Sequence, residues 1–439
     1  MMQLTWESAE KYVLELPLHT KKNPFEVTKA FYEWMGEPGS AYPVIHVAGT
    51  NGKGSVCAYI NSILSEAGYR TGMFTSPHLV DIRERFVYEN EQIAGPEFAR
   101  HLEKLQDRLK VYENGSYQPT FFETLFFVFL LWMEEKQPDC ILLEAGIGGR
   151  LDVTNVVSRP AAAVITRIGL DHCEYLGNTA VQIAGEKAGI LKKGTPAVCF
   201  ETDEAVTRVF AGKAQELSIP LVTVSKREIA FSKLRKNYID FFLQSAYDRD
   251  IEARLDTTAL YQTENAALAV RTLEQLTHLF PVTVDQIRQG LSRMRWEARM
   301  EEIAPDIFLD GAHNPDGIRA FVESVSRDGY DGRRWLVFGA CADKSVEEMA
   351  SVLQQSGLFK RVTGTLLESK RSLTKRELTD LFAQGRPEMD FVFEDAAHAF
   401  ASVLRQKEED TRVYIVGSLY LAGEVKRYGK EKNAEVSHD

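Results

Sequence analysis

A short apolar run that leads into a glycine-rich loop and then into a helical pattern constrains the fold of this chain more than any other segment. The run covers residues 44–48, the helical pattern begins at Ser55, and the loop between them contains Gly49, Gly52, Lys53 and Gly54. Glycines let backbone N–H groups approach an anion, a helix N-terminus adds positive potential, and a lysine adds a full charge. The segment therefore predicts a phosphate-binding loop with a nucleoside triphosphate as its ligand. The alternative is an ordinary tight turn between a strand and a helix.

The spacing within this loop differs from the strict Walker pattern, which has a glycine five residues before its Gly-Lys pair. Val47 occupies that position here, and Gly54 separates Lys53 from the hydroxyl of Ser55. We therefore expect a variant of the phosphate-binding loop.

Strand-like and helix-like segments alternate along the chain. Strands are expected at residues 44–48, 70–74, 140–144, 161–166, 196–200, 220–224, 306–310, 334–338, 391–394 and 412–416. Helices are expected at residues 55–67, 97–110, 121–135, 203–216, 259–277, 283–292, 345–355 and 395–407. Such alternation predicts an α/β fold with parallel sheets that helices cover on both faces.

A chain of 439 residues exceeds what one hydrophobic core supports, so two domains are expected. The boundary is placed near residues 294–300, after a helical window and before a new strand. This gives a mostly parallel sheet domain with the phosphate-binding loop at residues 1–296, and a smaller Rossmann-like α/β domain at residues 297–439. Residues 225–260 are rich in charge and less regular, and we expect an excursion of the first domain there.

Charge and cysteine usage exclude several classes of protein. The formal net charge of −11 argues against a nucleic-acid partner, which needs a basic surface. The five cysteines are scattered, which favours reduced thiols in a cytoplasmic protein over disulfides or a zinc site. The N-terminus lacks the basic-then-apolar pattern of a secretion signal. The longest apolar run, residues 124–133, is about half a membrane span and predicts a buried helix rather than a membrane partner.

Polar residues follow the strand expected at residues 140–144. Glu144 stands at its carboxyl end, where ligands bind in open α/β sheets, and an acidic residue opposite a phosphate-binding loop commonly holds Mg²⁺. Arg150 and Asp152 follow as polar recognition groups. The alternative for Glu144 is a solvated charge at the end of a strand.

A second polar cluster follows the strand expected at residues 161–166. His172 lies there, on the same side of the sheet as Glu144, and we predict that it is a metal ligand, although a lone histidine is more often structural. Lys187 lies on the next helix, which is expected to begin near Thr179. It is either a counter-charge for phosphate or, when neutral, an amine that reacts with CO₂ to give a carbamate ligand. The sequence leaves both open.

Three further segments offer polar groups. Arg83 and Arg85 would meet an anionic substrate, unless residues 74–86 are a plain loop and amphipathic strand. Asp310, at a strand end in the second domain, is placed to bond a ribose, and His313 a phosphate. Asn265 stands at an expected helix start, where capping is the alternative to ligand binding.

Seven segments, taken together and in order, resemble the folylpolyglutamate synthase and dihydrofolate synthase family of the Mur ligase superfamily. They are HVAGTNGKGS, FTSPHL, EAGIGGRLDVTN, ITRIGLDHCEYLG, IAGEKAGI, DGAHNPDG and GSLYLAGEV, and they lie between residues 46 and 425. Any one of them is weak evidence, whereas the set is highly specific.

The resemblance implies roles for individual residues. The residues that match the loop holding the ATP phosphates are Gly52, Lys53, Gly54 and Ser55. Those that match Mg²⁺ ligands are Ser76, Glu144 and His172, and Lys187 matches a lysine that is carbamylated in family members. Further ATP contacts are matched by Asn265, Arg299 and Asp310, and positions near the pteridine ring of the substrate by Phe122, Leu151, Asp152 and Val153.

The resemblance also implies the chemistry of an ATP-dependent amide ligase. A folate γ-carboxylate attacks the γ-phosphate of ATP, and the amine of L-glutamate then displaces phosphate from the acyl phosphate. The implied partners are reduced folate, L-glutamate and ATP, with Mg²⁺ as cofactor, a monovalent cation such as K⁺ as a further candidate, and a monomeric enzyme. The active site would form between the domains, so closure would bring Arg299 and Asp310 to the nucleotide. Whether dihydropteroate is a second acceptor stays open.

One segment departs from the family pattern. The family linker usually reads Trp-Pro-Gly-Arg, whereas Trp296 and Arg299 flank Glu297 and Ala298 here. Proline fixes φ and glycine frees it, so their loss is expected to alter a hinge, and a Glu-Ala pair tolerates helix.

Two other functions fit parts of the sequence. A Mur-type ligase that joins an amino acid to a UDP-sugar shares the fold and the ATP chemistry, but the TSPHL and GGRLDVTN segments favour folate. A regulatory NTPase needs only the phosphate-binding loop, and a guanine-specific one would show an Asn-Lys-x-Asp motif, which the sequence lacks.

Overall fold

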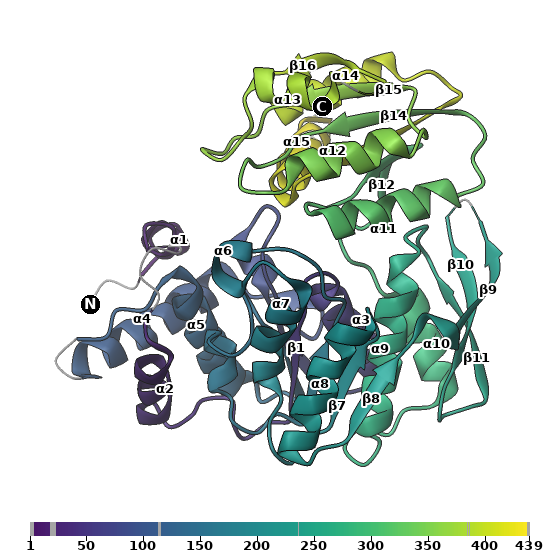
Figure 1. Ribbon diagram of the computed structural model, residues 1–439. Coiled ribbons are helices and arrows are strands. Elements are labelled where there is room, and N and C mark those ends of the chain that lie inside the picture. The colour runs from purple at the N-terminus through teal and green to yellow at the C-terminus, as the bar shows by residue number, and fades with distance from the viewer. Residues whose placement is uncertain are drawn as a thin grey trace. The chain divides into compact units, whose positions relative to one another are not determined.

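The computed structural model of the chain describes residues 4–17, 23–112, 116–235, 237–383, 385 and 387–436. The chain forms two compact units. Unit 1 consists of Met1–Ile229, Leu243–Ile251 and Glu264–Met294, and unit 2 of Ala230–Phe242, Glu252–Thr263 and Arg295–Asp439. Each unit combines a mostly parallel sheet with helices, so the predicted α/β fold class is confirmed (Figure 1).

The described part of unit 1 contains an eight-stranded sheet in the order β4-β3-β2-β5-β1-β6-β7-β8. Its parallel strands are β1 (Val44–Ala48), β2 (Thr71–Phe74), β5 (Cys140–Glu144), β6 (Ala162–Ile165), β7 (Ala197–Phe200) and β8 (Leu221–Val224). Two short antiparallel strands, β3 (Phe86–Tyr88) and β4 (Glu91–Gln92), extend one edge. Because β1 lies between β5 and β6, the loops after these three strands meet at one edge of the sheet.

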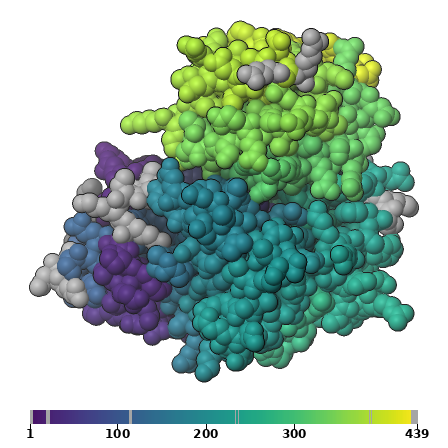
Figure 2. Space-filling view, in the orientation of Figure 1, coloured from purple at the N-terminus to yellow at the C-terminus, as the bar shows by residue number. Residues whose placement is uncertain are grey.

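Helices in this part of the chain pack against this sheet or against one another. They are α1 (Trp6–Leu14), α2 (Phe25–Trp34), α3 (Lys53–Glu66), α4 (Gly95–Val111), α5 (Phe121–Lys136), α6 (Cys173–Leu176), α7 (Ala180–Lys187), α8 (Glu204–Leu217), α9 (Tyr261–Gln275) and α10 (Val284–Arg293). Trp6 of α1 packs edge to face on Phe98 of α4. In Figure 2, purple surface from the N-terminal part of the chain lies next to blue surface from residues further along.

The apolar run predicted to be a buried helix is the body of α5. A capping box fixes its start, because the Thr120 side chain accepts from the backbone N–H of Glu123 and the Glu123 carboxylate accepts from that of Thr120. Residues 123–133 are buried in a cluster with α1, α2 and α4. Within the described ranges we find no helix whose length and apolarity would let it span a bilayer.

The charged segment expected to be irregular is a three-stranded sheet, so that expectation was wrong. Its strands are β9 (Ile229–Leu234), β10 (Ile239–Gln244) and β11 (Asp250–Leu255), in the order β11-β10-β9. Buried and more accessible residues alternate along β10 and β11. One buried face is enough for a strand, even when the other face is charged.

Unit 2 contains a six-stranded sheet in the order β12-β13-β17-β14-β15-β16. The strands are β12 (Glu301–Ala304), β13 (Ile307–Leu309), β14 (Arg333–Phe338), β15 (Arg361–Thr365), β16 (Met389–Phe393) and β17 (Thr411–Val416). All pair in parallel except β12, which is antiparallel to β13. The helices are α11 (Pro315–Ser326), α12 (Val346–Gln355), α13 (Lys375–Phe382), α14 (Ala396–Gln406) and α15 (Leu419–Val436).

Candidate active site

The glycine-rich loop connects β1 to α3, as predicted. Gly52 precedes the first residue of α3 and has a φ of 93°, a left-handed conformation that favours glycine. A Cβ atom at Gly49 would lie 1.7 Å from the Thr166 hydroxyl, so no other residue fits there. α3 begins at Lys53, two residues before the expected start, so the lysine belongs to the first helical turn.

Hydrogen bonds hold the loop against the segment that follows β6. The backbone N–H groups of Thr50 and Asn51 donate to the Arg167 carbonyl at 3.0 and 3.4 Å. The Thr166 hydroxyl donates to the Asn51 carbonyl at 2.7 Å, and the Thr50 hydroxyl donates to the Gly169 carbonyl at 3.0 Å. These contacts fix the backbone of the loop before any ligand arrives.

Lys53, Glu144 and Ser76 come together beside the loop. The Lys53 ammonium lies 3.7 Å from the Glu144 carboxylate and donates to the Thr50 carbonyl at 3.2 Å. The Ser76 backbone N–H donates to the other Glu144 oxygen at 2.9 Å. Glu144 is only 3% exposed, so the carboxylate is a buried anion beside a cation rather than a solvated strand end.

These groups suit a small divalent cation. Mg²⁺ binds through one or two carboxylates, hydroxyls and waters together with substrate phosphates, which matches Glu144 and Ser76 next to a phosphate-binding loop. In the part of the chain that the structure describes, no three His, Cys, Asp or Glu side chains are grouped to hold a metal by themselves. His172 is exposed at the N-cap of α6, with a φ of 51°, and its role as a ligand stays a prediction.

Lys187, the last residue of α7, is buried beneath the loop. Its side chain donates to the Gly49 carbonyl at 2.6 Å and the residue is 4% exposed. Burial, with a further contribution from the charge of Lys53, lowers the pKa of Lys187 to about 7. A substantial fraction of this amine is therefore neutral at neutral pH, as a reaction with CO₂ requires.

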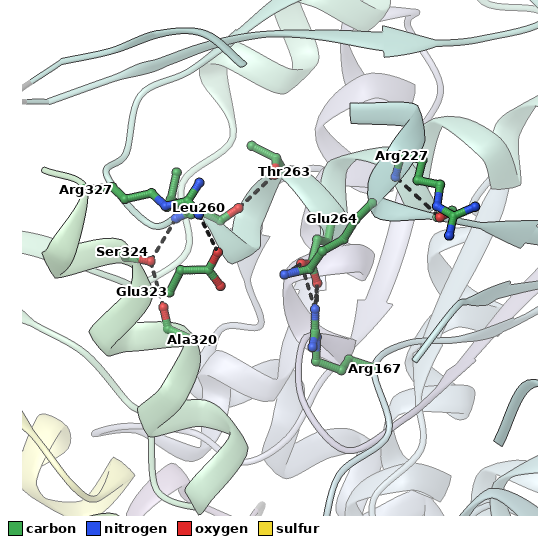
Figure 3. Close-up of polar contacts among 11 residues, drawn as sticks. Arg167, Arg227, Leu260, Thr263, Glu264, Ala320, Glu323, Ser324 and Arg327 are labelled. Carbon is green, nitrogen blue, oxygen red and sulfur yellow. Dashed lines mark hydrogen bonds and ion pairs between the residues drawn. The ribbon is translucent and has the colours of Figure 1, made fainter. Parts of the chain in front are cut away.

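Asn265 faces the loop from α9. A Cβ atom at Gly52 would lie 2.3 Å from the Asn265 side-chain oxygen. α9 begins at Tyr261, so Asn265 lies within the helix, and the capping alternative is wrong for this residue. Its neighbour Glu264 accepts two N–H groups of the Arg167 guanidinium, at 2.7 and 3.0 Å, as Figure 3 shows. Arg167 thus bonds α9 through its side chain and the loop through its carbonyl.

Two of the residues matched to the pteridine contacts, Phe122 and Asp152, lie beside Gly146. A Cβ atom there would lie 2.7 Å from the Phe122 ring and 3.2 Å from the Asp152 carboxylate. Asp152 is 2% exposed, and Val153 is equally buried in the hydrophobic core. Leu151 is 43% exposed, so its side chain is free to contact a ligand.

The two arginines at residues 83 and 85 differ. Arg83 pairs with Asp81 at 2.5 Å and lies over the Trp6 ring, so its charge is already matched. Arg85 is 7% exposed, donates to the His78 ring at 2.8 Å and lies over Phe121. Burial and the charge of Arg85 lower the pKa of His78 to about 3.

In unit 2, Asp310 follows β13 and is 2% exposed. Its carboxylate accepts the Tyr261 hydroxyl at 2.6 Å and the backbone N–H groups of Met300 and Ala312 at 3.0 and 2.8 Å. Burial raises the pKa of Asp310 despite these bonds. The nearby His313 ring lies 2.8 Å from the Gly311 carbonyl and is partly exposed.

The linker segment is a turn, not the helix that a Glu-Ala pair would tolerate. Ala298 has a φ of 52° and Met300 a φ of 50°, both left-handed. The Ala298 backbone accepts from Arg299 and from Gly311 at 2.8 Å, and its N–H donates to Glu301 at 2.7 Å. These contacts hold an alanine in a left-handed conformation that glycine adopts at less cost.

Sequence reasoning found the loop, Glu144 and Lys187, but it missed Thr166, the Arg167–Glu264 pair and the bond between Arg85 and His78. The contacts of Thr166 and the Arg167–Glu264 pair join segments that only the fold brings together, whereas Arg85 and His78 are seven residues apart. The one signal for Thr166 was its place at the end of a strand adjoining β1.

Comparisons with known proteins agree with this geometry. Residues 47–273 match the Mur ligase middle domain, and residues 294–419 match the Mur ligase glutamate ligase domain. The dihydrofolate synthase/folylpolyglutamate synthase of Bacillus subtilis is 31% identical over 402 residues, which cover 90% of this chain and 92% of that protein.

Two solved structures share the fold over nearly the whole chain. Mycobacterium tuberculosis folylpolyglutamate synthase complexed with ADP has a TM-score of 0.87 and 25% identity, covering 97% of this chain and 98% of that one. E. coli FolC in complex with DHPP and ADP has a TM-score of 0.84 and 26% identity, covering 98% of each chain.

The two α/β units and the lysine-bearing loop define an enzyme of the Mur ligase class. Within that class, the chain belongs to the folylpolyglutamate synthase and dihydrofolate synthase family.

Proposed function

We propose that this enzyme joins L-glutamate to the γ-carboxylate of a reduced, glutamylated folate at the expense of ATP. The observation that supports this most is the grouping of Lys53, Glu144 and Ser76 beside the glycine-rich loop, in the same unit as Phe122 and Asp152. The B. subtilis relative is named for both activities, which favours dihydropteroate as a second acceptor.

The nucleotide is assigned to the loop. Backbone N–H groups of Gly52, Lys53, Gly54 and Ser55 would bind the phosphates at the N-terminus of α3, and Asn265 would contact the nucleotide beside them. In unit 2, the residues proposed to contact the nucleotide are Arg299, Asp310 and His313. Mg²⁺, held by Ser76, Glu144 and His172, would neutralise charge on the phosphates, and K⁺ is a candidate for a second cation.

The chemistry follows from the weak electrophilicity of a carboxylate. A γ-carboxylate oxygen attacks the γ-phosphorus of ATP, the bond to ADP breaks, and an acyl phosphate forms. The glutamate amine, once deprotonated, attacks the acyl carbon, and phosphate leaves with the former carboxylate oxygen. Lys53 stabilises the charge that moves between the β- and γ-phosphate oxygens.

Lys187 is proposed to act as a carbamate. Its neutral amine adds to CO₂ and releases one proton, which leaves a buried carboxylate-like anion in place of the amine. The lowered pKa supports this role, because only the uncharged amine reacts. A carbamate would also remove the repulsion between the charges of Lys187 and Lys53.

The folate is assigned to unit 1. Asp152 would accept N–H groups of the pteridine, the Phe122 ring would stack on it, and Leu151 and Val153 would complete the apolar surface. We also propose that Arg83 binds the glutamyl carboxylates of the substrate. To do so, its guanidinium must give up its ion pair with Asp81. We further propose a domain boundary between residues 296 and 297. We also propose that the enzyme is a monomer that acts in the cytoplasm on small molecules.

The deciding experiment supplies dihydropteroate and a reduced folate separately, each with ATP, Mg²⁺ and L-glutamate, and weighs the products by mass spectrometry. A gain of one glutamate residue on the reduced folate, with ADP formed in equal amount, supports the proposal. ATP hydrolysis without any glutamylated product would refute it and favour a regulatory NTPase.

A further inference from the structure

A chain of hydrogen bonds runs from the centre of the unit 1 sheet to Asp152. His46, in the middle of β1, is fully buried, and its Nε2 lies 2.8 Å from the Thr154 hydroxyl oxygen. That hydroxyl lies 2.6 Å from the Asp152 carboxylate. Thr154 belongs to the short 3₁₀ helix Val153–Val156. Three buried polar side chains are therefore connected in series.

The direction of these bonds follows from the donors available. An ionised carboxylate only accepts, so the Thr154 hydroxyl donates to Asp152. Its oxygen is then an acceptor, so the proton of the neutral His46 ring lies on Nε2. Burial lowers the pKa of His46 to about 4, which keeps the ring neutral at neutral pH. The other ring nitrogen, Nδ1, is buried and has no hydrogen-bond partner among the described residues.

This arrangement is unfavourable for stability alone. A buried acceptor without a donor destabilises a fold, and an aliphatic side chain of similar size would avoid that cost. The benefit of the histidine therefore lies in the one bond it makes, the bond to Thr154.

That bond orients the carboxylate. Asp152 also accepts the backbone N–H groups of Thr154 and Ile147, each at 3.0 Å. Gly146, which has no side chain, leaves the carboxylate beside the Phe122 ring. A fixed carboxylate next to an aromatic face is what an aminopyrimidine ring, with its adjacent N–H donors, requires.

We propose that His46 and Thr154 are positioning residues for the folate: His46 fixes the Thr154 hydroxyl, which holds Asp152 at the angle that accepts the pteridine N–H groups. This inference rests on the proposed function. It assigns the two residues a role in acceptor affinity and none in nucleotide binding or phosphoryl transfer.

The test compares Thr154→Val, which removes the hydroxyl at nearly constant volume, with Thr154→Ser, which keeps it. We expect Thr154→Val to raise the KM for reduced folate about tenfold, with kcat and the KM for ATP within about twofold, and Thr154→Ser to stay within about twofold of wild type. His46→Leu is expected to raise the same KM about fivefold in the wild-type background and to have no further effect in Thr154→Val. Thr272→Val, which removes a buried hydroxyl from α9, is the control, with no change in either KM.

The inference would be overturned if Thr154→Val and Thr154→Ser raised the KM for reduced folate equally, or if the KM for ATP rose in parallel with it. It would also be overturned if the double variant of His46 and Thr154 raised the folate KM by the product of the two single effects. If His46→Leu does not fold, as thermal melting will reveal, the two Thr154 variants decide. Failure of the proposed function is distinguishable, since the wild-type enzyme would then glutamylate no folate at all.

Discussion

Lys187 offers a quantitative test, because its burial has a cost that depends on pH. The Lys187 pKa of about 7 lies well below its ordinary value of 10.5. Between these values the unfolded chain holds a proton that the folded chain has lost, so the stability of the folded enzyme rises with pH. The cost of burying this amine is about 4 kcal/mol at pH 7 and about 2 kcal/mol at pH 9.

The variant Lys187→Met removes this cost and leaves the Gly49 carbonyl without its donor, a loss of about 1–2 kcal/mol that does not depend on pH. Lys187→Met should therefore exceed the wild type in free energy of unfolding by about 2–3 kcal/mol at pH 7, and this advantage should shrink by about 2 kcal/mol at pH 9. Ligase activity should be lost at both pH values.

The assay is urea denaturation of both proteins at pH 7 and pH 9, in buffer freed of bicarbonate so that no carbamate forms. Lys193→Met, at an exposed neighbouring position, is the control, and we expect it to stay within about 0.5 kcal/mol of wild type at both pH values. An advantage of Lys187→Met that is independent of pH, or absent at pH 7, would refute the reasoning.

Three further changes test other parts of the site. Glu144→Gln should raise the Mg²⁺ concentration for half-maximal activity about tenfold or more, and an unchanged titration would remove Glu144 from the metal site. Arg167→Met should weaken ADP binding, measured by calorimetry, about tenfold. Lys226→Met removes the more exposed partner of Glu264 and should change ADP affinity less than about twofold. Equal losses of ADP affinity in the two variants would contradict a positioning role for Arg167. Ala298→Val should lower the free energy of unfolding in urea by about 2 kcal/mol, because a β-branched residue resists a φ of 52°. Ala298→Gly should lower it by less than about 1 kcal/mol. If the segment were helical, the glycine variant would be the less stable of the two.

The sequence predicted those parts of the fold that depend on local patterns. Continuous apolar runs marked β1, β5 and α5, and the start of α7 was expected near Thr179, because these signals act over a few neighbouring residues. β10 and β11 were missed because their charged faces hid an alternating buried face. The conformation of Ala298 was missed because alanine favours helix until contacts with Gly311 and Glu301 outweigh that preference.

The candidate site divides in the same way. Lys53 lies in a glycine-rich loop and Glu144 at the end of a strand, and both signals can be recognised in the local sequence. The bonds of His46 with Thr154 and of Arg167 with Glu264 join residues about a hundred positions apart. No local pattern predicts such pairs, because they exist only once β1, β6 and α9 have packed together.

If the folate carboxylate becomes an acyl phosphate, one of its oxygens is transferred to phosphate, and isotope labelling measures this transfer directly. The enzyme would be supplied with ATP, L-glutamate and a reduced folate carrying ¹⁸O in both oxygens of its γ-carboxylate, and the released phosphate would be analysed by mass spectrometry. With an acyl-phosphate intermediate, we expect one ¹⁸O atom in each phosphate and the other in the new amide carbonyl. Phosphate without ¹⁸O, formed alongside glutamylated product, would contradict it.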